Sequence, residues 1–108
     1  MYRQGDILLV PIDEDRVPEP VRLLPPLPRD PRGRMVLALG EVTGHAHAIA
    51  GPGTLLRDPD PLAPSHLHLP QGGRLVHEEH AAIALPSGWY RVVRQREYLP
   101  GAVRVVAD

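Results

Sequence analysis

Proline and glycine interrupt this sequence so often that no segment keeps a helical period over about 11 residues. The 108 residues include 14 prolines and 10 glycines, and the turn signals that they create recur at the spacing of short strands. The segments between the turns are rich in valine, leucine and isoleucine, which favour extended structure. The sequence therefore predicts an all-β protein of about seven to nine short strands, either a sandwich or a partly open barrel.

One domain spanning residues 1–108 is expected from this length. We expect strands at residues 5–12, 35–42, 45–49, 54–57, 65–69, 74–77, 81–85, 89–98 and 102–106. Residues 13–33 contain six prolines, each of which removes a backbone hydrogen-bond donor. This stretch is predicted to be a rigid loop without a helix, and its arginines, together with Arg34 just beyond it, are expected at the solvent-exposed surface.

The predicted hydrophobic core contains few aromatic side chains. Phenylalanine is absent and aromatic residues make up 4% of the chain, so aliphatic side chains must fill the interior. A core of this kind favours a homodimer that buries a shared sheet face or edge.

Charge and cysteine content narrow the classes of function. Without cysteine the chain has neither disulfides nor thiolate chemistry. The net charge of −1 argues against bulk binding of duplex nucleic acid, and no apolar run approaches the roughly 20 residues that span a bilayer. We expect a cytoplasmic protein that does not bind membranes. All 12 basic residues are arginine, which suits a small anionic ligand but does not act as a base.

Histidine is therefore the residue type suited to moving protons or binding a metal near neutral pH. Four of the six histidines form two pairs, His45 with His47 and His77 with His80. In an extended segment, His45 and His47 project from the same face. A bend between His77 and His80 would place one at the end of a strand and the other at the start of the next.

Three other polar patterns in the sequence are interpreted as structural and are not assigned to a functional site. The histidines of the segment 77–80 stand three residues apart, whereas the HExxH zinc helix needs four, so a zincin is rejected. His66 and His68 alternate with leucines, which predicts an edge strand whose histidines face water. Asp6 follows Gly5 at the start of a strand and is interpreted as a turn residue.

The two histidine pairs suit metal-free acid–base chemistry on a phosphodiester. One neutral imidazole takes a proton, a charged one donates a proton, and arginines stabilise the phosphate. RNA-type cleavage works in this way because the 2′-hydroxyl attacks its own phosphorus. This hypothesis needs no cofactor and makes His45, His47, His77 and His80 catalytic. The predicted substrate-binding residues are Arg91, Arg94, Arg96, Tyr98, Glu78 and Glu79.

Two alternatives remain open. The same four histidines could bind one transition metal such as zinc, iron, nickel or manganese in a cupin-like site, completed by Glu78, Glu79 or Glu41. The chain could also be a non-catalytic module that binds a nucleotide or a partner. The arginine-only set of basic residues favours the phosphodiesterase, because guanidinium groups bind phosphate well.

Several blocks resemble a family of small bacterial and phage β-proteins with GHAH and HEEHAxI motifs. The blocks are residues 4–9, 40–47, 77–86, 88–92 and 95–98. That family is similar to stand-alone CRISPR-associated ring nucleases, small dimers that linearise cyclic oligoadenylate in antiviral signalling without a metal. The resemblance implies a pocket for an anionic nucleotide-type ligand at a dimer interface, with histidines as acid and base.

Overall fold

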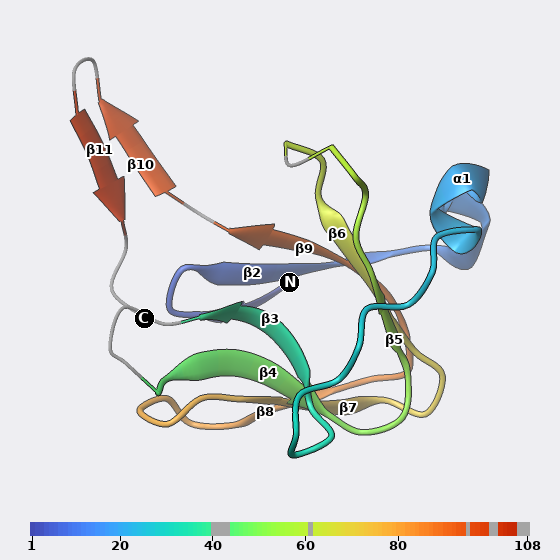
Figure 1. Ribbon diagram of the computed structural model, residues 1–108, viewed down its shortest axis with the longest axis horizontal. Coiled ribbons are helices and arrows are strands. Elements are labelled where there is room, and N and C mark those ends of the chain that lie inside the picture. The colour runs from blue at the N-terminus through green and yellow to red at the C-terminus, as the bar shows by residue number, and fades with distance from the viewer. Residues whose placement is uncertain (40–43, 61, 95, 100–101, 106–108) are drawn as a thin grey trace.

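The computed structural model describes residues 1–39, 44–60, 62–94, 96–99 and 102–105, and it describes the last two ranges by their backbone alone. Within these residues, the main elements are two antiparallel sheets that face each other (Figure 1). The predicted all-β sandwich is confirmed. In the described part of the chain the two sheets contain nine strands, within the predicted range.

Five strands form the first sheet, in the order β1-β2-β9-β6-β5. They are β1 (Tyr2–Gln4), β2 (Ile7–Ile12), β9 (Gly88–Arg94), β6 (Ser65–Leu69) and β5 (Thr54–Leu56). The central strand, β9, lies between β2 and β6. Because Ser65 at the start of β6 pairs with Val92, the end of β9 extends past β6 at Val93 and Arg94.

Four strands form the second sheet, in the order β3-β4-β7-β8. They are β3 (Met35–Leu39), β4 (Ala46–Ala50), β7 (Gly73–Val76) and β8 (Ile83–Leu85). In the β4–β7 pair, Ala48 lies opposite Val76 and Ile49 lies opposite Leu75. This register brings the residues just before Ala48 next to those just after Val76.

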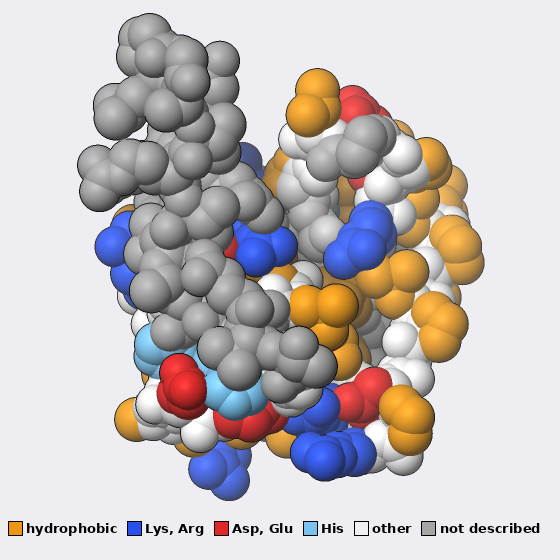
Figure 2. Space-filling model, turned by 60° about the vertical axis from the view of Figure 1, so that its left-hand side comes forward, with side chains coloured by type: hydrophobic (Ala, Val, Ile, Leu, Met, Phe, Trp, Pro, Cys, Tyr) orange, Lys and Arg blue, Asp and Glu red, His pale blue; other side chains and the backbone are white. Residues whose placement is uncertain are grey.

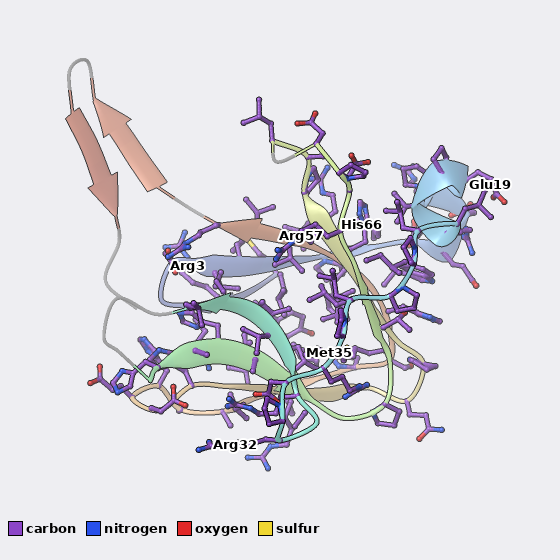
Figure 3. All side chains as sticks on the ribbon, in the orientation of Figure 1. Arg3, Glu19, Arg32, Met35, Arg57 and His66 are labelled. Atoms are coloured by element: carbon purple, nitrogen blue, oxygen red, sulfur yellow. The ribbon has the colours of Figure 1, made fainter. Side chains whose placement is uncertain are left out.

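The hydrophobic core lies between the two sheets. Leu9 and Leu67 come from the first sheet, Ile49 and Leu75 come from the second, and all four are fully buried. Figure 3 shows Met35 between the sheets, where it joins the same cluster. The cluster is largely aliphatic, as the composition predicts, and alternation along each strand sends these side chains to the same interior.

The prediction that residues 13–33 contain no helix is wrong. A 3₁₀ turn, η1 (Glu14–Arg16), and one α-helical turn, α1 (Glu19–Arg22), lie in this stretch. Pro20 stands in the first turn of α1, where a missing N–H costs no helical hydrogen bond. The turn buries Val21 against Leu56 and Trp89 of the first sheet, so burial of a small second cluster stabilises it.

The placement predicted for residues 65–69 is also wrong. The strand β6 is not an edge strand, because it pairs with both β9 and β5. Its leucines are buried as expected, but His66 is only 6% exposed. His68 stacks on Trp89 with ring centroids 4.3 Å apart. The cluster around α1 covers part of the face that was expected to meet water.

The chain ends differ from prediction as well. β1 was not predicted, and residues 89–98, predicted as one strand, are divided between β9, which ends at Arg94, and the separate strand β10 (Arg96–Leu99). β10 pairs with β11 (Ala102–Val105) in a hairpin that projects from the sheets (Figure 1). Positions 40–42, 95 and 106 of the predicted strands lie outside the described residues. In the part of the chain described, no helix has the length and apolar character needed to cross a membrane.

Candidate functional site

The two histidine pairs meet within one chain, at one end of the sandwich. The β4–β7 register places His47 beside His77, and their ring centroids are 4.4 Å apart. The ring centroid of His77 also lies 5.4 Å from that of His45 and 4.7 Å from that of His80. The structure thus brings together all four histidines selected from the sequence, and their roles stay predictions.

This histidine site extends from the interior of the protein to its surface. Ile49 and Leu75 point into the core, and alternation places His47 and His77 on the same face. His47 is 0% exposed and His77 is 8% exposed, whereas the side chain of His45 is 18% exposed. Polar groups buried to this degree need hydrogen-bond or ionic partners.

Gln4 holds His47 in place, although no pattern in the sequence pointed to it. From β1 in the first sheet, its amide nitrogen donates hydrogen bonds to the carbonyl oxygens of Leu75 (3.3 Å) and Ala81 (3.2 Å). The amide oxygen therefore faces Nδ1 of His47, at 3.0 Å. Because an amide oxygen only accepts, Nδ1 carries the hydrogen, and the other ring nitrogen, Nε2, is directed toward Asp6.

Asp6 connects the histidine site to Arg94. It lies in the turn between β1 and β2, as predicted, but it is 1% exposed. Nε of Arg94 donates to its Oδ2 at 2.7 Å, and its Oδ1 lies 3.7 Å from Nε2 of His47. Burial of a carboxylate requires such a partner. The sequence could not show this, because the two residues are 88 positions apart.

Glu78 is held by a backbone donor from the facing strand. Its Oε1 accepts a hydrogen bond from the N–H of Ala46 at 2.7 Å, and this bond lowers the pKa of Glu78. Its Oε2 lies 3.8 Å from Nη1 of Arg34, whose Nη2 also pairs with Asp30 at 2.9 Å. Arg34 was expected to face solvent with the arginines of residues 13–33. Its side chain is only 19% exposed, so that expectation is wrong for Arg34.

Glu79 contacts the site mainly through its backbone. Its N–H donates to Nδ1 of His77 at 3.0 Å. In the neutral ring of His77, the hydrogen must then be on Nε2. The carboxylate of Glu79 is 57% exposed, and its Oε1 lies 3.7 Å from Nδ1 of His45. The bend at residues 78–80 thus orients imidazoles from both pairs.

Three of these side chains could share one metal ion. One ligand atom from each of His45, His77 and Glu78 lies within 4.8 Å of the others. Around a tetrahedral zinc ion, ligand atoms stand about 3.4 Å apart, so small side-chain rotations would close the set. Within the described part of the chain, Nδ1 of His45 and Nε2 of His80 are buried without a hydrogen-bond partner.

The two predicted substrate-binding arginines whose side chains are described lie in a groove apart from the histidine cluster. Arg91 and Arg94 line an open groove of about 1030 Å³ beside the end of β9, together with Arg57, and the described lining contains no histidine. The side chains of Arg96 and Tyr98 lie outside the described residues. Figure 2 shows histidine and acidic side chains on the same face as a hollow flanked by basic side chains.

The fold and the site define a small β-sandwich protein with a cluster of four histidines at one end of its core. A family model described as "Domain of unknown function (DUF8820)" matches residues 3–95, and the chain belongs to this family. The match spans both sheets from Arg3 onward and stops before the β10–β11 hairpin. Searches of curated proteins and of solved structures found no match.

Proposed function

We propose that this protein binds one transition-metal ion at the histidine site. The observation that carries the proposal is the convergence of ligand atoms from His45, His77 and Glu78 to within 4.8 Å. Two imidazole nitrogens and a carboxylate oxygen form a donor set that suits zinc, ferrous iron or nickel. His80, whose ring centroid lies 4.7 Å from that of His77, is the candidate for a fourth ligand.

Burial favours a metal ion over a substrate between the histidines. A phosphodiester must touch both its acid and its base, but His47 is 0% and His77 is 8% exposed. An ion with bonds of about 2 Å fits between side chains where a phosphodiester does not. It would also give a bonding partner to Nδ1 of His45 and Nε2 of His80, which are buried and form no hydrogen bond within the described residues.

The surroundings of the site support the same proposal. The Ala46 N–H and Arg34 orient the carboxylate of Glu78. The hydrogen bond from Ala46 also lowers the pKa of Glu78 and so favours the ionised form that metal binding requires. Gln4 fixes the ring of His47 against His77. Contacts of this kind hold ligands in position before an ion arrives, which reduces the cost of ordering them.

Metal binding must break one contact. The N–H of Glu79 donates to Nδ1 of His77. An ion at Nδ1 replaces this hydrogen bond, and an ion at Nε2 moves the ring hydrogen to Nδ1, where it faces the N–H of Glu79. In both cases the hydrogen bond from Glu79 is lost, so metal binding rearranges the bend at residues 78–80.

Metal titration of the full chain tests the proposal. After treatment with a chelator, the protein should bind one Zn²⁺ or Ni²⁺ per chain in isothermal titration calorimetry, and Co²⁺ should give the visible absorption of a nitrogen and oxygen site. His45→Ala and Glu78→Gln should each weaken binding. The matched control is His68→Gln, because His68 stacks on Trp89 away from the site. Equal binding by all variants, or no binding by the wild type, would refute the proposal.

The second candidate is the metal-independent phosphodiesterase. The observation that favours it is the convergence of imidazole rings from both pairs around His77, because one neutral ring and one charged ring held close together could act as base and acid. The arginine-lined groove on the same face adds a site for an anion. For this candidate, cyclic oligoadenylate is proposed as the substrate only because of the family resemblance. Cleavage in EDTA that leaves 2′,3′-cyclic phosphate ends and is lost in His77→Ala would support this candidate over the metal.

A further inference from the structure

The groove beside the end of β9 follows from the strand lengths. β6 begins at Ser65 opposite Val92, so β6 does not cover the last residues of β9, Val93 and Arg94. The loop before β6 and the end of β3 form the other walls of an open groove of about 1030 Å³. This volume is at the upper end of the range for small-molecule sites. The histidine site contributes no described lining residue.

Positive charge dominates the described lining. It contains three guanidinium groups, from Arg57, Arg91 and Arg94, and one carboxylate, from Asp60. The side chain of Arg94 is already paired with Asp6 at 2.7 Å. Within the described residues, Arg57 and Arg91 form no ion pair, and both are exposed. Two arginines without acidic partners favour an anionic ligand.

Both arginines lie at the same end of the first sheet, where they line the groove. Leu56 pairs with His66, and His66 pairs with Arg91. Arg57 directly follows Leu56 in the chain, one position beyond this cross-strand row. Figure 3 shows Arg57 and His66 near each other at this end of the sheet. Two strand spacings, about 9–10 Å, separate the backbones of β5 and β9. Since both side chains line the same groove, both are available to an anion bound there.

The rest of the described lining is aliphatic. Leu39 and Leu62, from opposite walls, are 70% and 92% exposed, and Val36 and Val93 also line the groove. The described lining contains no aromatic side chain. Sites for nucleobases commonly stack the base on an aromatic ring. Aliphatic walls instead favour a flexible hydrocarbon body.

We propose that this groove binds an organic anion with an aliphatic body, such as a carboxylate on a hydrocarbon chain. Arg57 and Arg91 bind the carboxylate, and the leucines at the rims cover the hydrocarbon. The proposal does not depend on the metal at the histidine site, because the two sites share no described lining residue. Failure of one therefore leaves the other standing.

Octanoate is the probe for a binding test by nuclear magnetic resonance. Addition of octanoate at millimolar concentration should give saturable shifts of the Nε–H signals of Arg57 and Arg91 and of the methyl signals of Leu39 and Leu62. Octylammonium, which has the same chain and the opposite charge, should give no saturable shift. Adenosine monophosphate should bind more weakly than octanoate. Absence of saturation with octanoate, or tighter binding of the nucleotide, would overturn the proposal.

Matched variants identify the groups that bind the probe. Arg57→Gln and Arg91→Gln should each raise the octanoate Kd by about tenfold, the size of one charge-assisted contact of about 1.4 kcal/mol. Arg74→Gln is the control, because Arg74 is exposed on β7 and does not line the groove. Each variant is first compared with the wild type by its backbone amide spectrum. Equal affinity in folded Arg57→Gln, Arg91→Gln and wild-type protein would refute the assignment.

Discussion

Oε1 of Gln4 lies 3.0 Å from Nδ1 of His47, so a side chain of the first sheet fixes the tautomer of a histidine in the second. The same amide group donates to the carbonyl oxygens of Leu75 in β7 and of Ala81 in the segment between β7 and β8. Gln4 is 3% exposed and His47 is 0% exposed. These bonds therefore join the two sheets at the point where the hydrophobic core ends and the histidine site begins.

Gln4→Ala should destabilise the protein by about 1–3 kcal/mol, the cost of leaving buried polar groups without partners. The substitution removes the hydrogen bonds to His47, Leu75 and Ala81 together. The free energy of unfolding in urea measures the effect. Gln71→Ala is the matched control, because Gln71 is exposed in a turn and should change stability little. Equal stabilities of the two variants would contradict a structural role for Gln4.

Asp6→Asn should also lower stability, but by less than the about 3–5 kcal/mol seen when one member of a fully buried ion pair is removed. Its partner, Arg94, is 36% exposed, so water can solvate the guanidinium after the change. Urea unfolding again gives the measurement. Asp13→Asn is the comparison, since Asp13 and Arg16 form a pair with both side chains 80% exposed. That pair should contribute little, and a larger loss there than at Asp6 would exclude the buried network.

The fold could be predicted from the sequence because it follows from local chemistry. Proline and glycine positions set the turns, and alternation along residues 65–69 set which leucines enter the core. The errors arose where long-range packing decided the outcome. One turn of helix forms at α1 because Val21 finds an apolar cluster with Trp89, and His66 is buried because strands lie on both sides of β6. Neither neighbour is visible in the local sequence.

The histidine site could be predicted only in part for the same reason. The spacing of His45 and His47 predicts a shared face, and the bend at residues 78–80 predicts the second pair nearby. Gln4 and Asp6 carry no such signal, because a short N-terminal segment with one glutamine and one turn aspartate is common. Their roles come from contacts between residues more than 40 positions apart in the sequence, such as the contact of Gln4 with His47.

The stability of the protein should fall in mild acid partly because of His66. Burial lowers the pKa of His66 from its ordinary value of 6.5, the charge of Arg91 adds to this shift, and Asp58 opposes it. The unfolded chain therefore binds the proton more tightly than the folded chain, so protonation favours unfolding. The contribution is complete above about pH 6.5 and is lost as the pH falls through the lower pKa of the folded state.

Urea unfolding from about pH 8 to about pH 5 measures this contribution. His66→Gln should lose less stability than the wild type over the same pH range, because the variant lacks the group that gains a proton on unfolding. Gln71→Ala should parallel the wild type, since Gln71 is exposed and does not titrate. Parallel curves for His66→Gln and the wild type would show that His66 does not drive the loss.

The last prediction concerns the amide of Glu79, which donates to Nδ1 of His77 at 3.0 Å. Zn²⁺ binding should release this hydrogen bond whichever ring nitrogen takes the ion, so the Glu79 amide resonance should shift and its hydrogen exchange should accelerate. At a Zn²⁺ concentration of 100 times Kd, the protein as a whole should gain about 2.7 kcal/mol of stability. A local loss of protection within a globally stabilised protein distinguishes binding at His77 from binding at the surface.

His45→Ala separates this effect from nonspecific binding. The variant keeps the bond between Glu79 and His77 but removes one proposed ligand, so Zn²⁺ should no longer change the Glu79 amide or the stability. The amide of Ala46 provides an internal reference, because it donates to Oε1 of Glu78 at 2.7 Å and that carboxylate can bind the ion through Oε2. Faster exchange at Glu79 with Ala46 still protected would place the ion at His77. Unchanged exchange at Glu79 in zinc-bound wild-type protein would exclude His77 as a ligand.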